Sequence, residues 1–418
     1  MSEAYDAIII GAGVIGSAIG LELARRGWRT LNIDRHPAAG YGSTSSSCAI
    51  IRTFYSTVEG SAFAQEGYHY WKNWSDYLAT KDERGLARFR ECGCLVLKTP
   101  ANGNLEKMLR IVREAGIPFE EWDAARLRSA MPHWDLCKFG PPRAPDDDRF
   151  AVPSGGEIEG AVFFPQAGYV GDPQLATHNL QRAAEAAGGQ FRFNADVAEI
   201  VKSNTRVIGV KLRGGETLLA PVVVNAAGPS SARINRLAGV LADMKIRTRA
   251  LKREVAHVPA PLADYERRFF VTSDSDAGCY SRPETGNEIL IGSEDPECDK
   301  RQWVDADGYD RSFTEQVRNQ VLRMAQRIPE IPIPSSIQGV VDCYDVSDDW
   351  IPIYDRSSLP GYYMAIGTSG NQFKNAALSG AVMAHLIQAC EDGHDHDREP
   401  LRFTGRHTGR VFDLSFFS

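Results

Sequence analysis

The sequence has no long apolar run. Its apolar stretches fall far short of the roughly 20 residues that a membrane-spanning helix needs, so no transmembrane segment is expected. The first apolar run already begins at Tyr5, which leaves no room for a signal peptide, and we expect a cytoplasmic location. Lysine and arginine are spread along a chain of net charge -7, so neither nucleic acid nor a membrane surface is an expected partner.

Patterns typical of metal sites and disulfide frameworks are missing too. The 8 cysteines include no Cys-x-x-Cys pair, and none is spaced with histidine as zinc ligands are. We therefore expect free thiols and no metal site, since a solvated loop explains the acidic stretch around His394 and His396. No internal repeat or low-complexity tract interrupts the chain, whose 418 residues allow two or three domains.

A dinucleotide-binding fingerprint opens the chain. The apolar run 5–10 is followed directly by Gly11-Ala12-Gly13-Val14-Ile15-Gly16. A helical pattern over 17–26 and a second apolar run that ends at Asp34 complete the fingerprint. Gly11 permits the tight turn, Gly13 lets the backbone approach a pyrophosphate, and Gly16 lets the helix pack closely on the strand. We expect the phosphates at the helix N-terminus, with Asp34 accepting a hydrogen bond from the ribose.

The rest of the chain combines two kinds of unit. Helices are expected at 61–78, 104–115, 123–131, 172–187, 314–328 and 376–389. Strands are expected at 94–97, 161–164, 191–193, 197–202, 207–212, 221–225 and 362–366, and antiparallel strands at 250–258, 268–272, 279–282 and 288–291. The predicted class is α/β plus antiparallel β, with a Rossmann-type domain from 1–85, 151–235 and 336–418, and a substrate domain of antiparallel sheet and helices from 86–150 and 236–335.

Three further segments follow the fingerprint in a characteristic order, namely Ile50-Ile51-Arg52, Val222 to Pro229, and Gly361 to Lys374. In the last of them, glycines bracket a loop that runs into Phe373-Lys374 and a helix of small residues. Together the four segments resemble flavoenzymes of the D-amino-acid oxidase superfamily, and within it the sarcosine oxidase- and glycine oxidase-like amine oxidases. The resemblance extends over nearly the whole chain.

The resemblance implies FAD as the cofactor, bound in extended form. The residues expected to hold it are Gly11, Gly13, Val14, Ile15, Gly16, Asp34, Arg35, Ser43, Thr44, Ser45, Val197, Ala227, Gly228, Gly367, Gly370, Asn371, Gln372, Phe373 and Lys374. Relatives that link FAD to a cysteine carry it two residues before a tyrosine that Tyr344 matches, in a segment beside the flavin edge. Here that position is Asp342, and Cys343, one residue later in a strand, points to the other face, so we expect noncovalent FAD.

The resemblance also implies a substrate cavity roofed by the antiparallel sheet. Arg52 and Lys374 match positions that hold the substrate carboxylate, and Tyr280 matches a tyrosine of the pocket. Two cations that converge on one carboxylate would fix a small amino acid with its α-hydrogen facing flavin N5. Each cation also has a simpler explanation: Arg52 could pair with a structural acid or a phosphate, and Lys374 could lie near a flavin carbonyl. Tyr280 could bond the substrate or only pack.

The expected reaction is oxidation of the C–N bond of a small amino acid or N-methyl amino acid. Hydride would pass to flavin N5, and the imine would then be hydrolysed. One alternative is an FAD-dependent 2-hydroxy-acid or polyol-phosphate dehydrogenase, which needs a base, yet no histidine lies in the matched pocket segments. The other alternative is a non-catalytic FAD-binding subunit, against which the presence of Arg52, Lys374 and Tyr280 together argues.

Two positions favour a dehydrogenase over an oxidase. The family's oxidases carry a lysine over the flavin, and alignment through Gly292 puts Leu290 at that position. Leucine cannot stabilise developing superoxide by charge, so the electrons are expected to leave to another, unidentified acceptor. The same alignment puts Glu294 in place of a pocket histidine. Glu294 would attract a second cationic group on the substrate or, as we prefer here, lie on the surface of a strand.

Overall fold

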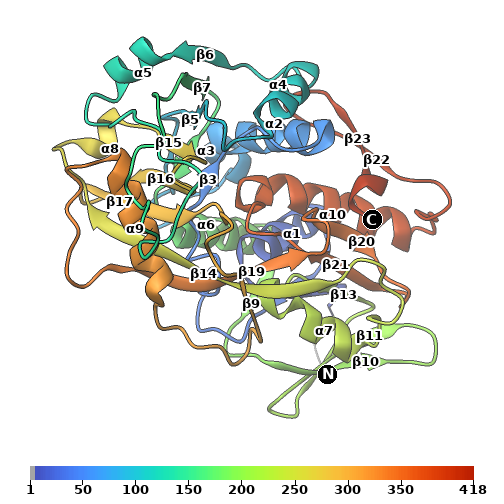
Figure 1. Ribbon diagram of the computed structural model, residues 1–418. Helices are drawn as coiled ribbons and strands as arrows, with labels where there is room; N and C mark the ends of the chain where they lie inside the picture. Colours follow the sequence, from blue (N-terminus) through green and yellow to red (C-terminus); the bar gives the residue numbers. More distant parts are fainter. Residues whose placement is uncertain (1–4) are drawn as a thin grey trace.

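The computed structural model describes residues 5–418 and is built around two sheets (Figure 1). The first has six strands in the order β20 (Ile353–Arg356), β21 (Tyr362–Ile366), β13 (Val222–Asn225), β1 (Ala7–Ile10), β2 (Thr30–Ile33) and β9 (Gln190–Arg192). All neighbouring pairs are parallel except β20 with β21. These strands read as continuous apolar runs because both faces of the sheet are covered.

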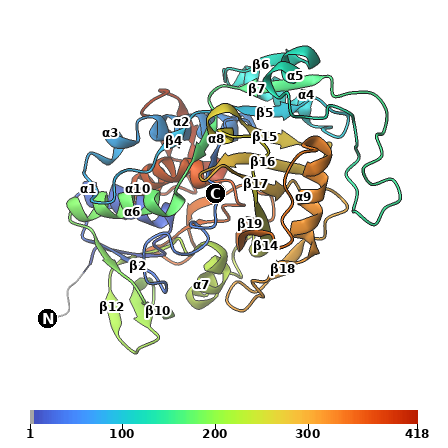
Figure 2. The same ribbon diagram turned by 90° about the vertical axis from the view of Figure 1, so that its left-hand side faces the viewer.

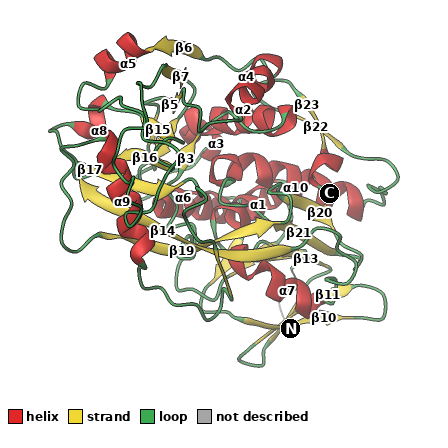
Figure 3. Ribbon diagram, viewed as in Figure 1, coloured by secondary structure: helices red, strands yellow, loops and turns green. Residues whose placement is uncertain are grey.

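Alternate residues of β1 belong to different hydrophobic cores. Ala7 and Ile9 pack with the helices α1 (Val14–Arg25), α6 (Pro173–Ala186) and α10 (Ala376–Glu391). Ile8 and Ile10 pack with α7 (Ser231–Ala238) and the antiparallel strands β10 (Val197–Lys202), β11 (Val207–Leu212) and β12 (Thr217–Leu219). Figure 3 shows this helix layer and strand layer on opposite sides of the sheet. The period-two alternation of a strand thus fixes which layer each residue meets.

The second sheet has nine strands. Along the sheet lie β18 (Gln302–Val304), β14 (Thr248–Pro259), β17 (Glu288–Ser293), β16 (Cys279–Glu284), β15 (Val271–Asp274), β5 (Cys94–Leu97), β7 (Gly160–Phe164) and β6 (Glu120–Asp123), and β19 (Gln338–Ser347) also pairs with β14. Only β5 with β15 is parallel. Helix α9 (Glu315–Arg327) covers its outer face (Figure 2). The predicted class, α/β plus antiparallel β, is confirmed.

Sheet membership differs from the expected segments at two places. Strand β7 pairs with β5 and β6, and β19 pairs with β14, so both join the nine-stranded sheet. From the sequence, both stretches are expected in the nucleotide-binding domain, because nothing in their own residues indicates which sheet they join. Pairing over such sequence separations is set by packing and not by local composition.

The remaining elements surround these sheets. A three-stranded sheet joins β3 (Ile50–Ile51), β8 (Gly168–Val170) and β4 (Phe89–Arg90), and a hairpin pairs β22 (Arg402–Thr404) with β23 (Val411–Asp413). The other helices are α2 (Val58–Lys72), α3 (Trp74–Leu78), α4 (Leu105–Glu114), α5 (Ala124–Ala130) and α8 (Tyr265–Arg268). None of the helices within residues 5–418 combines the length and apolar character of a bilayer-spanning segment.

The helix expected over 61–78 is two helices. It begins earlier than expected, at Val58, because the Thr57 hydroxyl accepts a hydrogen bond from the backbone N–H of Gly60 at 3.0 Å and caps the N-terminus. Asn73 ends α2: it leaves helical geometry at φ -113°, and its side-chain amide donates to the carbonyl of His69 at 2.8 Å. The chain thereby turns into α3.

A buried ion-pair network holds α9 against the nine-stranded sheet. Arg327 is 1% exposed at its side chain and lies 2.9 Å from Asp274 and 3.0 Å from Asp276. Asp276 also accepts the backbone N–H groups of Phe139 and Gly140 at 2.7 and 2.9 Å. One guanidinium therefore joins the helix, the end of β15 and the loop around residue 140.

Replacing Arg327 with methionine is expected to lower the free energy of unfolding by about 3–5 kcal/mol, because two buried carboxylates lose their counter-charge. The matched control is Arg128→Met, which removes an ion pair with Glu157 whose side chains are 52% and 56% exposed. That change should cost less than about 1 kcal/mol. Urea unfolding followed by tryptophan fluorescence measures both, and equal midpoints for the two variants would contradict the assignment.

Candidate active site

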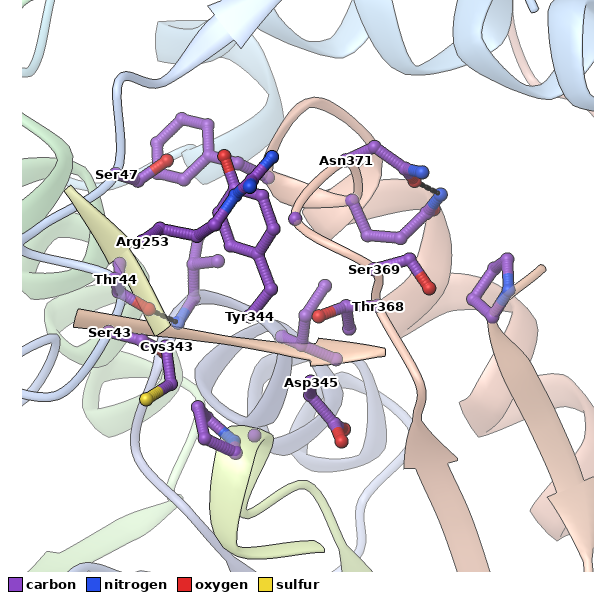
Figure 4. Close-up of a pocket in the computed structure, with 18 of the residues that line it drawn as sticks. Ser43, Thr44, Ser47, Arg253, Cys343, Tyr344, Asp345, Thr368, Ser369 and Asn371 are labelled. Atoms are coloured by element: carbon purple, nitrogen blue, oxygen red, sulfur yellow. Dashed lines mark hydrogen bonds between the residues drawn. The ribbon is translucent and has the colours of Figure 1, made fainter. Parts of the chain in front are cut away.

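A cavity of about 810 Å³ lies where the loops that follow the parallel strands meet the nine-stranded sheet. Ile10, Ile33 and Ala226, at the carboxyl ends of β1, β2 and β13, form one wall. Residues of β14 and β19 line the cavity from the nine-stranded sheet (Figure 4), as do residues of β15 and β17. Ligands of open α/β sheets bind at this edge, outside the carboxyl ends of the strands.

The glycine loop is packed too tightly for side chains at two of its positions. Gly11 has φ +115°, and a Cβ there would lie 2.2 Å from the carbonyl oxygen of Ala226. A Cβ on Gly16 would lie 2.1 Å from the carbonyl oxygen of Gly11. Helix α1 begins after Gly13 with no side-chain cap and no acidic residue in its first turn. Its N-terminus therefore presents the cavity with positive dipole and backbone N–H groups.

Asp34 ties the loop after β1 to the loop after β2. Its carboxylate accepts the backbone N–H groups of Ala12 and His36, each at 2.8 Å. Thr44, from the serine-rich loop, accepts the backbone N–H of Val14 at 3.2 Å. Both acceptors thus organise the start of α1, and both line the cavity.

Most of the residues expected to hold the cofactor line this one cavity. They are Gly11, Gly13, Val14, Ile15, Asp34, Arg35, Ser43, Thr44, Val197, Ala227, Gly228, Gly370, Asn371, Gln372, Phe373 and Lys374. Gly16, Ser45 and Gly367 are not among the described residues that line the cavity. Gly16 packs on Gly11, the hydroxyl of Ser45 donates to the carbonyl of Gly42 at 2.9 Å, and the backbone N–H of Gly367 donates to Asp345 at 2.7 Å.

Arg52 and Lys374 converge on one side chain that the sequence did not indicate, Tyr55. The Nε of Arg52 donates to the Tyr55 hydroxyl at 3.2 Å, and its guanidinium carbon lies 4.8 Å from the centroid of the Tyr55 ring. The Lys374 ammonium lies 4.6 Å from the same centroid and donates to the carbonyl of Asn371. All three line the cavity, so two cations separated by more than three hundred residues meet at one place.

The charges of this cluster shift one another's pKa values. Burial raises the pKa of the Tyr55 hydroxyl, but Arg52 and Lys374 outweigh burial and hold it below its usual range. Burial lowers the pKa of Lys374, and the charge of Arg52 lowers it further, against the attraction of Tyr55. The local surplus is positive and favours an anion beside Arg52 and Lys374.

Tyr280 and its neighbours form a row of side chains on the cavity face of the second sheet. Tyr280 pairs with Ser273 on one side and Gly292 on the other, and a Cβ on Gly292 would lie 2.3 Å from the Tyr280 hydroxyl oxygen. That hydroxyl lies 3.3 Å from the sulfur of Cys48, which belongs to the loop before β3. Because Gly292 has no side chain, the Tyr280 ring can lie directly over it.

Leu290 is 2% exposed and is not among the described residues that line the cavity. A cation of the neighbouring strand β14 lines it instead: Arg253 forms an ion pair with Asp295, and its guanidinium carbon lies 5.0 Å from the Tyr344 ring centroid (Figure 4). The alignment therefore pointed to a residue of β17, whereas the cation that lines the cavity here is Arg253 of the neighbouring strand β14. Sequence reasoning missed Arg253 because nothing local marks it.

Glu294 lines the cavity, so our preference for a surface position was wrong. Its two carboxylate oxygens accept hydrogen bonds from the hydroxyls of Ser273, at 2.5 Å, and Ser275, at 3.1 Å. Burial raises the pKa of Glu294 to about 7; Asp274 raises it too, while the two serines and Arg52 oppose the shift. Glu294 lies one residue beyond β17, and its place in the cavity depends on the serines that β15 and the turn after it bring opposite the carboxylate.

The Asp342–Tyr344 segment lies in β19. Asp342 accepts a hydrogen bond from the hydroxyl of Ser46 at 3.0 Å, and both residues line the cavity. In Figure 4 the sulfur of Cys343 points away from Arg253 and Tyr344. The expected opposite orientations of Cys343 and Tyr344 are thus present in the strand.

Comparison with known proteins agrees with this geometry. The model of a family described as FAD dependent oxidoreductase matches residues 6–386. The glycine oxidase of Geobacillus kaustophilus is 25% identical over 98% of this chain and 99% of its own, and the sarcosine oxidase subunit beta of Rhizobium meliloti is 24% identical over 92% and 84%.

Solved structures share the fold. The L-proline dehydrogenase of P. horikoshii superposes with a TM-score of 0.76 at 21% identity, over 93% of this chain and 95% of that one. The glycine oxidase of Geobacillus kaustophilus gives 0.75 at 22% identity, over 95% and 98%. With the family model matching most of its length, the chain belongs to the FAD-dependent oxidoreductases of the D-amino-acid oxidase type.

Proposed function

We propose that the protein oxidises the C–N bond of a small amino acid or N-methyl amino acid. The observation that carries the proposal is the convergence of Arg52 and Lys374 on one point of the cavity wall, beside Tyr55. An Arg fork and a Lys point charge together suit a carboxylate. The curated relatives named for glycine and sarcosine oxidation support the same substrate class.

The cavity suits extended FAD. The uncapped N-terminus of α1 would hold the pyrophosphate, because Gly13 adds no side chain and the first turn brings no acid. Asp34 would accept from the ribose on the same side, and the loop 367–374 would lie along the ring system. Once bound, FAD would supply a two-electron acceptor. Cys343 lines the cavity, but its sulfur points away from Tyr344, and the position that matches the linking cysteine of covalent relatives is Asp342.

The chain's own residues then orient the substrate. Arg52 and Lys374 bind the carboxylate, and Tyr55 stands between the two cations where it can donate its hydroxyl proton to that anion. Tyr280 closes the pocket from the sheet side, and its ring excludes water from the space above Gly292. This arrangement fixes the Cα of an amino acid relative to the ring system, which is the main task left to the protein.

We propose a dehydrogenase and not an oxidase. Leu290 brings no charge to the cavity, and the positive charge of Arg253 is neutralised by Asp295. A 2-hydroxy-acid or polyol-phosphate dehydrogenase is less well supported, because the residues 5–418 that line the cavity include one histidine, His36, which lies beside Asp34 at the nucleotide end. A base that takes the proton from a substrate hydroxyl would have to lie near Arg52 and Lys374, the pair of cations called the clamp below.

Replacing Asp34 with alanine is expected to weaken FAD binding by about tenfold or more, because a charged acceptor of two backbone N–H groups is lost. The control is Asp6→Ala, which removes an exposed carboxylate paired with Arg29 outside the cavity. Flavin fluorescence during titration of the apoprotein measures both affinities. An unchanged affinity in Asp34→Ala would contradict the assignment of the nucleotide end.

Replacing Arg52 with methionine should lower the affinity for carboxylate ligands by about thirtyfold or more. Truncating one partner of a buried charge pair costs on the order of 2 kcal/mol or more of binding free energy. Sarcosine and sarcosinamide make a matched ligand pair. Anaerobic bleaching of the flavin should favour the acid in the unaltered protein, and the preference should collapse in the variant. If Arg52→Met keeps the full preference for the acid, the clamp is misassigned.

The reduced flavin is expected to be reoxidised by dichlorophenolindophenol at least about tenfold faster than by air, because Leu290 brings no charge to the cavity and Asp295 neutralises Arg253, while Arg52 and Lys374 would be held by the ligand carboxylate. Stopped-flow absorbance after anaerobic reduction, with either acceptor in the second syringe, measures the two rates. Faster reaction with air would make the protein an oxidase.

A further inference from the structure

We propose that Glu294 selects amino acids whose side chain ends in a second cationic group. The inference rests on the proposed function: the clamp of Arg52 and Lys374 takes the substrate carboxylate, and Glu294 takes the distal amine. The substrate class is therefore a basic amino acid.

Glu294 is a carboxylate of the cavity without a counter-charge, and it is the one that shares the substrate end of the cavity with Arg52. It forms no salt bridge within residues 5–418, whereas the adjacent Asp295 pairs with both Arg253 and Arg301. Its hydrogen bonds come from two neutral hydroxyls, those of Ser273 and Ser275. Hydroxyl donors orient the carboxylate without cancelling its charge, so a cationic ligand group would meet the full attraction.

The strand end that carries Glu294 is joined to the loop before α4. The backbone N–H of Glu294 donates to the carbonyl of Gly278 at 3.0 Å, in the turn that follows β15. The hydroxyl of Thr99 donates to Asp276 of the same turn at 3.2 Å and ties the loop before α4 to it. From that loop and helix, the exposed residues Asn104 and Lys107 line the cavity.

The two ends of the pocket are electrostatically coupled. Arg52 and Glu294 both line the cavity. Burial raises the pKa of Glu294, and the charge of Arg52 opposes that shift, so the two charges interact across the cavity. The other ionisable groups around Glu294 are Asp274 of β15, itself bound to Arg327, and the thiol of Cys94 in β5. A ligand that is anionic at one end and cationic at the other complements this arrangement.

The test compares ornithine with norvaline, and lysine with norleucine, each pair differing only by the terminal amine. Both enantiomers are used, and the apparent Kd for anaerobic flavin reduction is measured in the holoenzyme. Ornithine or lysine should bind at least about tenfold more tightly than its partner, and Glu294→Gln should abolish that preference. The control Glu297→Gln removes an exposed carboxylate three residues away and should leave it intact.

The preference should also depend on pH. Because the pKa of Glu294 is about 7, the carboxylate is neutralised as the pH falls below that value, and the ratio of the two affinities should shrink. Both α-amines stay almost fully protonated over this range, so the neutral fraction of each ligand changes in parallel with pH and the α-amines add no pH dependence to the ratio. A ratio that stays constant between about pH 6 and pH 8 would overturn the proposal.

Other outcomes separate the two proposals. If norvaline and norleucine reduce the flavin as effectively as their basic partners, the proposed role of Glu294 is wrong. Amino-acid oxidation as the function is not contradicted by that result. If Glu294→Gln slows reduction by both members of a pair equally, the carboxylate contacts the reacting amine, and the proposed side-chain role is wrong. Failure of every amino acid to bleach the flavin would remove the proposed function itself.

Discussion

The site depends on placing two buried cations side by side. Arg52 follows the short strand β3, and Lys374 lies in the turn before α10, so their meeting requires both sheets and the helix layer to be in place. Like charges in a buried space repel and lose hydration. Tyr55 and the carbonyl of Asn371 offset part of that cost, and an anionic ligand would offset more. The fold thus favours the binding of an anion beside Arg52 and Lys374.

The nine-stranded sheet supplies the opposite wall through strand register. Ser273, Tyr280, Gly292 and Val255 are successive cross-strand partners, so they form one row across the cavity face. Moving any of these strands by one residue would turn its cavity side chains toward α9. The ion pairs of Arg327 with Asp274 and Asp276 hold the end of β15 and help to fix that register. A buried ion pair remote from Arg52 and Lys374 thereby affects which side chains face the cavity.

Local patterns predicted much of this molecule, and long-range pairing limited the rest. The strand, glycine turn and helix at the N-terminus are encoded within a short window, and their residues line the cavity as the fingerprint indicates. The faces of Cys343 and Tyr344 followed from alternation alone. Tyr55, Arg253 and Glu294 could not be assigned in the same way, because their roles depend on what strands and loops far along the chain bring opposite them.

The order of the strands has a consequence for biosynthesis. The Gly11 loop rests against Ala226, and β1 can pair early with β2, but its other edge pairs with β13 and stays open until more than two hundred further residues have been added. β21 then completes the parallel array only near the C-terminus. Such non-local pairing slows folding and leaves strand edges unpaired meanwhile. The glycine turn is therefore made long before the strands that complete its site, and a nascent chain has no complete nucleotide site until β21 has been made.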